Sequence, residues 1–274
     1  MRIGIVAPAS RIEPALAEET AAIARAICDA ELYFHPQCFL ASGHFAGDDD
    51  ARADAFVELA NDPAIDAVWI ARGGYGSNRI AERVVAKLTD SARRKIYLGY
   101  SDAGFLLAGL YRAGFERIAH GPVVADLKRD GGRTAIERAL RFLTGRAVAG
   151  DLEPAVAEGK PVAAFNLTIL SHLIGTPLEP DLSDHILMVE DVAEHLYAID
   201  RALFHVTAVP AIRRIAGLKL GRFSDIPEND PPFGESTEQI AKHWCAVSGI
   251  AWLGRADIGH DVDNKIVPFG TWRG

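Results

Sequence analysis

The sequence has 274 residues, of which 49% are hydrophobic and 24% charged, and its formal net charge is −8. This length can bury one large core or two smaller ones, and the composition is that of a soluble globular protein. Apart from two short basic runs at 93–95 and 213–214 there is no Lys/Arg cluster. Nucleic-acid binding is therefore excluded, because phosphate contacts need clustered cations.

The N-terminal run MRIGIVAPAS is too short in apolar residues for a secretory signal, and no window approaches the ~18 apolar residues of a membrane span. The three cysteines, Cys28, Cys38 and Cys245, show no CxxC spacing, which favours neither structural zinc nor a disulfide framework. We therefore expect a cytoplasmic protein without membrane or nucleic-acid partners, whose cysteines act as small apolar residues in or near the core.

The first half alternates short apolar strands with amphipathic helices. Asp48 to Asp50 form an N-terminal capping signal, and Asn61-Asp62-Pro63 ends the same helix. Strand–helix alternation of this kind predicts a mostly parallel sheet covered by helices on both faces. Strands are predicted at 2–7, 32–37, 66–71, 95–99 and 118–121, and helices at about 13–29, 48–60, 78–87, directly after residue 101, and 133–144.

The pattern changes near Gly145. We interpret 145–161, rich in Gly, Ala, Glu and Pro, as a linker with room for one strand. Beyond it the sequence predicts strands at 186–190, 215–222 and 250–254, helices at about 195–208 and 235–247, and a polar, loop-like final segment. Two domains, 1–148 and 149–274, are expected. Ligands of such sheets bind beyond the carboxyl ends of the strands, so the loops after the third and fourth strands are the first candidates.

The fourth strand is followed by a nucleophile-elbow pattern. KIYLG runs into Gly99-Tyr100-Ser101-Asp102, and helical sequence begins at once, a setting that exposes a serine on a sharp strand-to-helix turn. The helix N-terminus there favours developing negative charge. The match to G-x-S-x-G is incomplete because residue 103 is Ala. The segment alone leaves a second interpretation open, in which Ser101 is an N-cap and Asp102 a first-turn acid.

A glycine-rich loop, RGGYG, ends the third strand. Consecutive glycines let the backbone approach a ligand and aim N–H groups inward, although a tight turn with positive φ explains them equally. The run is neither G-x-G-x-x-G nor a P-loop, so nucleotide binding is not indicated. If this loop lies beside Ser101, Gly73 or Gly74 could donate a hydrogen bond to an oxyanion.

The second half offers a base and a carboxylate. VEDV places Glu190 and Asp191 at the end of an apolar strand, and DIGHDVDN places His260 in a glycine-flanked loop. A serine hydroxyl needs a base, usually a histidine held in one tautomer by a carboxylate. The acids Asp257, Asp261 and Asp263 leave a metal site open as an alternative, although their spacing is not that of a Ca²⁺ loop and one histidine is weak evidence for zinc.

Several segments recur in a characteristic order: RGGYG, GYSD, HGP at 120–122, NLTILSHLIGTP at 166–177, VEDV with YAIDRAL, GHDVDN, and PFG near the end. In this order they resemble the LD-carboxypeptidases, a family that includes muramoyltetrapeptide carboxypeptidases and the microcin C self-immunity peptidase. The resemblance extends over nearly the whole chain, from residue 7 to residue 270.

The resemblance implies a flavodoxin-like N-terminal α/β domain, a smaller C-terminal α/β domain, and an active site between them. It implies Ser101 as nucleophile, His260 as base and Glu190 as the carboxylate that orients it. The oxyanion hole would be the backbone N–H groups of Asp102 and Gly74. The family requires no cofactor or metal, and homodimers are common in it.

The activity implied is that of a serine carboxypeptidase that removes the terminal D-amino acid, D-Ala, from cytoplasmic murein tetrapeptide in peptidoglycan recycling. Candidate substrate contacts are Arg72, Gly73, Tyr100 and His120. Arg72 could pair with the terminal carboxylate of the peptide or brace its own loop from behind, and the sequence favours neither.

Two other functions stay open. One is a peptidyl-nucleotide hydrolase of the microcin C type in the same family, and the other is a non-catalytic module that binds a small ligand with RGGYG as an anion nest. The sequence also departs from the family pattern, with Ala164-Phe165 before NLT and Asp261 after the histidine. These departures affect the expected substrate pocket more than the chemistry.

Overall fold

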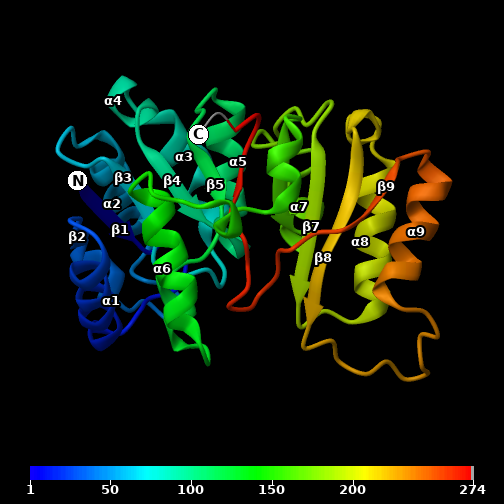
Figure 1. Ribbon diagram of the computed structural model, residues 1–274, viewed down its shortest axis with the longest axis horizontal. Coiled ribbons are helices and arrows are strands. Elements are labelled where there is room, and N and C mark those ends of the chain that lie inside the picture. The colour runs from blue at the N-terminus through cyan, green and yellow to red at the C-terminus, as the bar shows by residue number, and fades with distance from the viewer. Residues whose placement is uncertain (273–274) are drawn as a thin grey trace.

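Two β-sheets lie side by side in the computed structural model, which describes residues 1–272 (Figure 1). The larger sheet has the order β10-β5-β4-β3-β1-β2. Strands β1 to β5 are parallel to one another, and β10 is antiparallel to β5. The order 2-1-3-4-5 is that of flavodoxin-like folds, so the predicted fold class is confirmed. The strands are β1 (Arg2–Val6), β2 (Glu31–Phe34), β3 (Ala67–Ile70), β4 (Ile96–Gly99), β5 (Ile118–His120) and β10 (Val267–Pro268).

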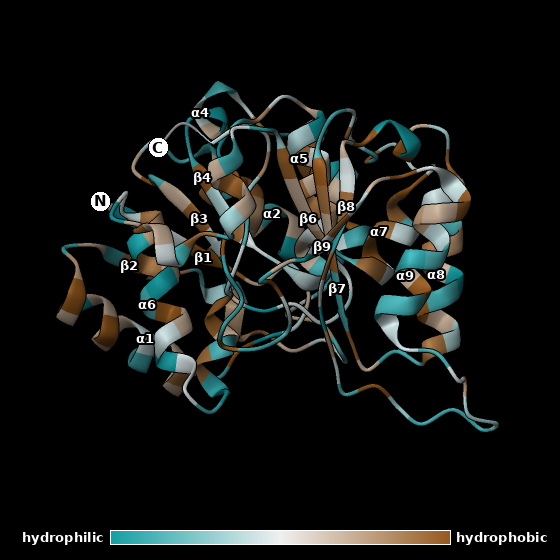
Figure 2. Ribbon diagram, turned by 45° about the vertical axis from the view of Figure 1, so that its right-hand side comes forward, coloured by the Kyte–Doolittle hydropathy of each residue, from teal (hydrophilic) through white to brown (hydrophobic). Residues whose placement is uncertain are grey.

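Helices cover both faces of this sheet because successive side chains of each strand point to opposite sides. Val68 packs with α2, α3 and α5 on one face, and Trp69 packs with α1 and α6 on the other. Figure 2 shows the hydrophobic residues gathered on these central strands. The helices are α1 (Pro14–Ile27), α2 (Asp49–Asn61), α3 (Ala81–Ala86), α4 (Asp90–Arg93), α5 (Gly104–Arg112) and α6 (Gly132–Leu143).

The second sheet has the order β6-β7-β8-β9 and is parallel throughout. It consists of β6 (Val162–Asn166), β7 (Ile186–Val192), β8 (Gly217–Ser224) and β9 (Trp252–Arg255), with helices α7 (Leu167–Leu173), α8 (Leu196–Ala208) and α9 (Thr237–Ser248). No helix within residues 1–272 combines the length and the apolar character that crossing a bilayer requires.

Most predicted elements are confirmed, but four were missed, one of them the short helix α4. The sequence analysis assigned no strand to 162–166 and no helix to 167–173, where β6 and α7 lie. VAAFN is short and Ala-rich and adjoins the linker, so it lacks a strand-like period. The final segment is not wholly loop-like, since β10 adds to the first sheet. The proposed division at residue 148 falls between α6 and β6.

The two sheets share a hydrophobic core. Leu106 of α5, Leu170 of α7 and Val189 of β7 belong to one buried cluster. Gly104 permits this contact, because a Cβ there would lie 2.9 Å from the Ile169 side chain. The packing of α5 on α7 therefore fixes how one sheet lies against the other.

The C-terminal segment ties the two sheets together. After β9 it crosses back to the first sheet, where β10 pairs with β5. Val162 and Gly270 exchange backbone hydrogen bonds of 3.0 and 2.9 Å. Buried Arg138 of α6 donates to the carbonyls of Val262 (2.7 Å) and Asn264 (3.0 Å). The loop that carries His260 is thereby held against the first sheet.

We predict that Arg138→Met destabilises the protein by about 2–4 kcal/mol, because the carbonyls of half-buried Val262 and buried Asn264 lose a charged donor. Urea unfolding followed by circular dichroism measures this change. Arg133→Met is the matched control on the same helix: Arg133 is exposed and pairs with Glu137 at the surface, so its loss should cost about 0.5 kcal/mol or less. Equal stability of the two variants would contradict the assigned role of Arg138.

Candidate functional site

A cavity of about 300 Å³ lies beyond the carboxyl ends of β3 and β4, where ligands of such sheets bind. Six of the residues that line it were predicted from the sequence: Arg72, Gly73, Gly74, Tyr100, Ser101 and His260. The loops after the third and fourth strands thus meet the C-terminal loop at one place.

Ser101 occupies a strained turn between β4 and α5. Its φ is +60°, a region that non-glycine residues adopt at a cost and that is typical of a nucleophile elbow. Gly99 is required there because a Cβ would lie 2.6 Å from Ile70. An alanine is tolerated at residue 103, where the G-x-S-x-G pattern has glycine, because its methyl group lies 3.4 Å from the position of a Cβ on Gly99. The N-cap interpretation of Ser101 is wrong: the cap is Tyr100, and no side chain caps this turn.

The RGGYG loop is held against Ser101 from two sides. The Asp102 carboxylate accepts hydrogen bonds from the backbone N–H groups of Gly76 (3.2 Å) and Ser77 (2.9 Å). The fully buried guanidinium of Arg52 donates to the Gly76 carbonyl at 2.9 Å and to the Pro8 carbonyl. Asp102, the acid in the first helical turn, therefore orders the RGGYG loop as well as the start of the helix.

Residues 73 and 74 must be glycine because other atoms lie close to them, and Gly74 also has a positive φ. A Cβ on Gly73 would lie 3.0 Å from Ser101 Oγ and 3.6 Å from the Asp102 nitrogen. Gly74 has a φ of +110°, and a Cβ there would lie 2.4 Å from Ser10 Oγ. These distances place Gly73 beside Ser101, whereas Gly74 lies beside Ser10 and lines the same cavity as Ser101. The choice of Gly74, with Asp102, as donor stays a prediction.

Glu190 and His260 form a buried pair. Glu190 Oε2 lies 2.5 Å from His260 Nδ1, and the two residues are 0% and 9% exposed. Burial raises the pKa of Glu190, and its interaction with His260 opposes that effect. Burial alone would lower the pKa of His260, but the Glu190 carboxylate raises it above 6.5 overall. The hydrogen bond at Nδ1 leaves Nε2 as the free basic nitrogen of a neutral ring.

Ser101 and His260 line the same cavity without a direct hydrogen bond between their side chains in the described part of the chain. In apo enzymes such bonds are often long and shorten when substrate binds. The arrangement can therefore support proton transfer from serine to imidazole once a ligand fills the cavity.

Tyr100 supports the imidazole. Its ring lies 4.8 Å from the His260 ring and 5.5 Å from the His120 ring, measured between centroids. Its hydroxyl donates to Asp126 Oδ1 at 2.8 Å. Only a small part of Tyr100 lines the cavity, since it is 2% exposed. Its aromatic face therefore fixes one side of His260.

His120 needs a correction. We expected it to contact substrate, but it is 1% exposed and is not among the cavity-lining residues. Its Nε2 bonds Asn264 Oδ1 at 3.3 Å, and burial lowers its pKa to about 3. His120 therefore supports Tyr100 and the C-terminal loop instead of contacting substrate.

The acids near His260 have cationic or backbone partners. Arg222 pairs with Asp261 (2.5 Å) and with Asp257, and no group of metal-ligating side chains occurs within residues 1–272. Asp191 accepts bonds from the Asn166 amide (2.6 Å) and the Thr168 hydroxyl (2.8 Å). The NLT and VEDV motifs are thus linked directly, and Glu190 is the member that faces His260.

Five cavity residues were missed in the sequence, namely Val123 and Ala125 and the charged residues Asp126, Lys128 and Arg129. They follow β5, whose carboxyl end lies at the same sheet edge as those of β3 and β4. The predicted parallel strand at 118–121 was the available signal, because its carboxyl end must lie at the same sheet edge as those of the third and fourth strands. Arg129 bonds Asp126 at 3.0 Å, whereas Arg72 donates to the Arg11 carbonyl at 3.3 Å. Arg72 therefore both braces its loop and reaches the cavity.

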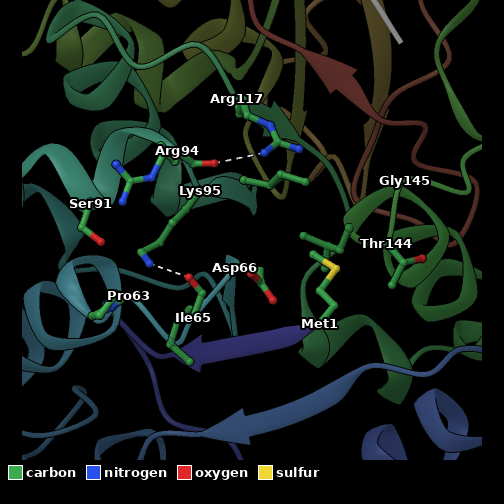
Figure 3. A pocket seen from close by; sticks show the side chains of 12 residues that line it. Met1, Pro63, Ile65, Asp66, Ser91, Arg94, Lys95, Arg117, Thr144 and Gly145 are labelled. Atoms are coloured by element: carbon green, nitrogen blue, oxygen red, sulfur yellow. Dashed lines mark hydrogen bonds between the residues drawn. The ribbon is translucent and has the colours of Figure 1, made fainter.

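A second cavity, of about 420 Å³, lies at the opposite, amino-terminal edge of the larger sheet (Figure 3). Its lining includes Asp66, Lys95 and Arg117, and the Lys95 ammonium donates a hydrogen bond to the carbonyl of Ile65, which also lines the cavity. None of the predicted site residues lies there, so the candidate site is the cavity at Ser101.

Family models and known proteins match both halves of the chain. Residues 3–121 match the LD-carboxypeptidase N-terminal domain, and residues 160–273 match the LD-carboxypeptidase C-terminal domain. A putative carboxypeptidase of Synechocystis is 32% identical over 235 residues, which are 84% of this chain and 76% of the relative. The murein tetrapeptide carboxypeptidase of Pseudomonas aeruginosa is 28% identical over 98% of this chain and 91% of its own.

Solved structures share the fold. The muramoyltetrapeptide carboxypeptidase from Oxalobacter formigenes has a TM-score of 0.81 at 24% identity, covering 98% of this chain and 93% of its own. The microcin C7 self immunity protein MccF has a TM-score of 0.77 at 17% identity, covering 98% and 91%. The class that the family models and the sequence relatives have in common is that of carboxypeptidases. The chain belongs to the LD-carboxypeptidase family.

We predict that an NMR titration gives His260 a pKa above 6.5, and that Glu190→Gln brings it below that value. The substitution removes the stabilising carboxylate but leaves the burial that disfavours the imidazolium. His120 is an internal control, since its pKa of about 3 keeps it neutral in both proteins. An unchanged His260 pKa in the variant would refute the coupling.

Proposed function

We propose that the protein is a serine carboxypeptidase that cleaves the bond before the terminal D-amino acid of a murein tetrapeptide. One observation carries the proposal: a strained serine lines the same cavity as a histidine whose other ring nitrogen is bound to a buried glutamate. Membership of the LD-carboxypeptidase family supports it.

Ser101 Oγ attacks the peptide carbonyl while His260 Nε2 takes the hydroxyl proton. Glu190 stabilises the imidazolium that forms and holds the ring in the reactive tautomer. The tetrahedral oxyanion accepts hydrogen bonds from the backbone N–H groups of Asp102 and Gly74. His260 returns the proton to the leaving amine, and then activates the water that hydrolyses the acyl-enzyme.

Cations around the cavity suit a substrate with a free carboxylate. Arg72 and Lys128 line it together with Arg129, and Arg129 is partly neutralised by Asp126. A guanidinium can bind a carboxylate through two parallel hydrogen bonds. We therefore assign the terminal carboxylate of the peptide to Arg72, which would favour exopeptidase over endopeptidase cleavage.

We also propose that the protein acts in the cytoplasm on peptides in peptidoglycan recycling. We propose further that it is a homodimer. Light scattering coupled to size-exclusion chromatography tests the homodimer.

We predict that Ser101→Ala folds and loses about 10³-fold or more in kcat on murein tetrapeptide, because the nucleophile is gone. Release of the terminal amino acid, followed by mass spectrometry, is the measurement. Cys245→Ala is the control, because Cys245 is buried away from the cavity and its replacement should not abolish turnover. A fully active Ser101→Ala enzyme, or activity removed by EDTA and restored by zinc, would exclude the serine mechanism.

We predict that kcat/KM rises with pH through a midpoint above 6.5, because His260 must be neutral to accept the proton and its pKa is raised. Activity is retained above this midpoint and lost below it. Glu190→Gln should lower kcat by roughly 10³- to 10⁴-fold, by analogy with the amide variant of the Ser-His-Asp triad, and move the midpoint to lower pH. A midpoint that does not move would contradict the assignment.

The peptidyl-nucleotide alternative is tested with the same protein. Murein tetrapeptide and a peptidyl adenylate are offered separately, and the products are identified by mass spectrometry. Cleavage of the adenylate alone would replace murein peptide as the substrate while leaving the serine mechanism in place.

A further inference from the structure

The segment that follows β1, residues 7–10, lies beside the RGGYG loop. Strands β1 and β3 pair in parallel (Figure 1), so the segments that follow them leave the sheet at the same edge. We call residues 7–10 the β1 loop; their sequence is APAS, and all four are buried. Neither the proposed nucleophile nor the proposed base belongs to this loop, although the family resemblance begins with it.

The β1 loop is held by buried groups behind it. The Gln37 side chain, 2% exposed, accepts the Ala7 N–H at 3.2 Å and donates to the Ala7 carbonyl at 2.8 Å. The Ala46 N–H donates to the Ala9 carbonyl at 2.9 Å. A buried polar network whose members are paired in this way is rigid. The loop can therefore act as a fixed support for what lies against it.

Ser10 connects this support to the two glycines near the nucleophile. Its N–H donates to the Gly73 carbonyl at 3.3 Å. Its side chain lies against Gly74, where a Cβ would be 2.4 Å from Ser10 Oγ, and Oγ also forms a hydrogen bond of 3.3 Å with His44 Nε2. Both the backbone and the side chain of Ser10 thus contact the peptide unit that joins Gly73 to Gly74.

This contact fixes the direction of the Gly74 N–H. In a planar trans peptide the carbonyl and the N–H point in opposite directions. Because the Gly73 carbonyl points at Ser10, the Gly74 N–H points away from the β1 loop. The Gly74 nitrogen is two bonds from the Cα of Gly73, whose Cβ position lies 3.0 Å from Ser101 Oγ. Among residues 1–272 the N–H groups of Gly74 and Asp102 have no hydrogen-bond partner, so both are available to a ligand.

We propose that Ser10 is a positioning residue of the oxyanion hole: its N–H holds the Gly73–Gly74 peptide so that the Gly74 N–H faces the oxyanion that forms at Ser101. This inference rests on the proposed function. Without that hold the peptide can turn over, because two glycines offer little steric resistance. The Gly73 carbonyl would then face the oxyanion and repel it. Ser10 thus acts on the transition state through Gly74 and does not touch the substrate.

Ser10→Pro tests this role, because the proline ring takes the place of the N–H opposite the Gly73 carbonyl. Loss of one oxyanion-hole donor costs about 10²- to 10³-fold in kcat, and we expect that loss on murein tetrapeptide, with KM changed by less than about threefold. Ser10→Ala keeps the N–H and should lose less than about tenfold, because only the bond to His44 is removed.

Arg11→Pro is the matched control, because it places a proline at the next position of the chain. The Arg11 N–H has no hydrogen-bond partner in the described range 1–272, so its removal should leave kcat within about threefold of wild type. A loss in Arg11→Pro as large as that in Ser10→Pro would show that proline damages this region in general, and would overturn the role of Ser10.

Two further measurements separate positioning from misfolding. A fluorophosphonate reacts with Ser101 by displacement of fluoride, and its phosphoryl oxygen occupies the oxyanion hole, so the labelling rate of Ser10→Pro should fall by about 10²-fold. The pKa of His260, measured by NMR, should be unchanged, since Ser10 contacts neither His260 nor Glu190. If Ser10→Pro does not fold, an ester in place of the Ala9–Ser10 amide removes the same N–H. A synthetic segment of residues 1–27 joined to Cys28 introduces it.

Ser10 has no positioning role if Ser10→Pro or the ester protein matches Ser10→Ala in kcat. The same follows if the loss appears in KM, or if the His260 pKa moves with it. Labelling of wild-type Ser101 without cleavage of murein tetrapeptide would reject the proposed substrate, and the labelling rates would still decide the role of Ser10. Wild-type protein that is neither labelled nor active would reject the serine mechanism and this role together.

Discussion

The hydrogen bond between Glu190 and His260 is the interaction on which the arrangement of the molecule depends. A carboxylate at the end of β7 is 0% exposed, and its Oε1 has no hydrogen-bond partner among residues 1–272. Burying such a charge without a partner is costly. The imidazole is the group that compensates it, and it arrives on a segment that ends in the other sheet. The Glu190–His260 pair therefore adds a polar link to the apolar packing that joins the two sheets.

The loop around His260 is held on both sides so that the imidazole keeps one orientation. Arg222 of β8 binds Asp257 and Asp261, which flank the histidine. Arg138 of α6 binds the carbonyls that follow, and Asn264 accepts the Gly259 N–H at 3.2 Å. One guanidinium thus comes from each lobe. A base fixed in this way needs little reorganisation when a substrate binds.

The nucleophile side depends only on the first sheet. Asp102 and Arg52 hold the glycine loop, and the surrounding core maintains the left-handed turn at Ser101. Strain of this kind persists only where neighbouring structure determines it. The two halves of the site are therefore built independently and meet through the packing of Gly104 on Ile169 and of Phe165 on Phe269, whose ring centroids are 5.1 Å apart.

The sequence predicted those parts of the site that depend on neighbouring residues, and missed parts that depend on contacts between distant residues. Ser101 could be found because an elbow is a local pattern: a strand, a glycine and a helix start. The roles of Glu190 and His260 came from family resemblance, since no local pattern reports a contact across 70 residues. Asp126 and Arg129 were missed because their position depends on β5 pairing beside β4. Strand β10 was missed because a two-residue strand is too short to show a hydrophobic period, and it is recognised by its pairing with β5.

The charges around the cavity at Ser101 constrain the direction in which a ligand can lie. The net charge of the chain is −8, yet Arg72, Lys128 and Arg129 line this cavity. A ligand with an anionic end lowers its electrostatic energy by placing that end at these cations. The peptide that we propose as substrate has a free carboxyl terminus, and it meets this condition when its last peptide bond lies at Ser101.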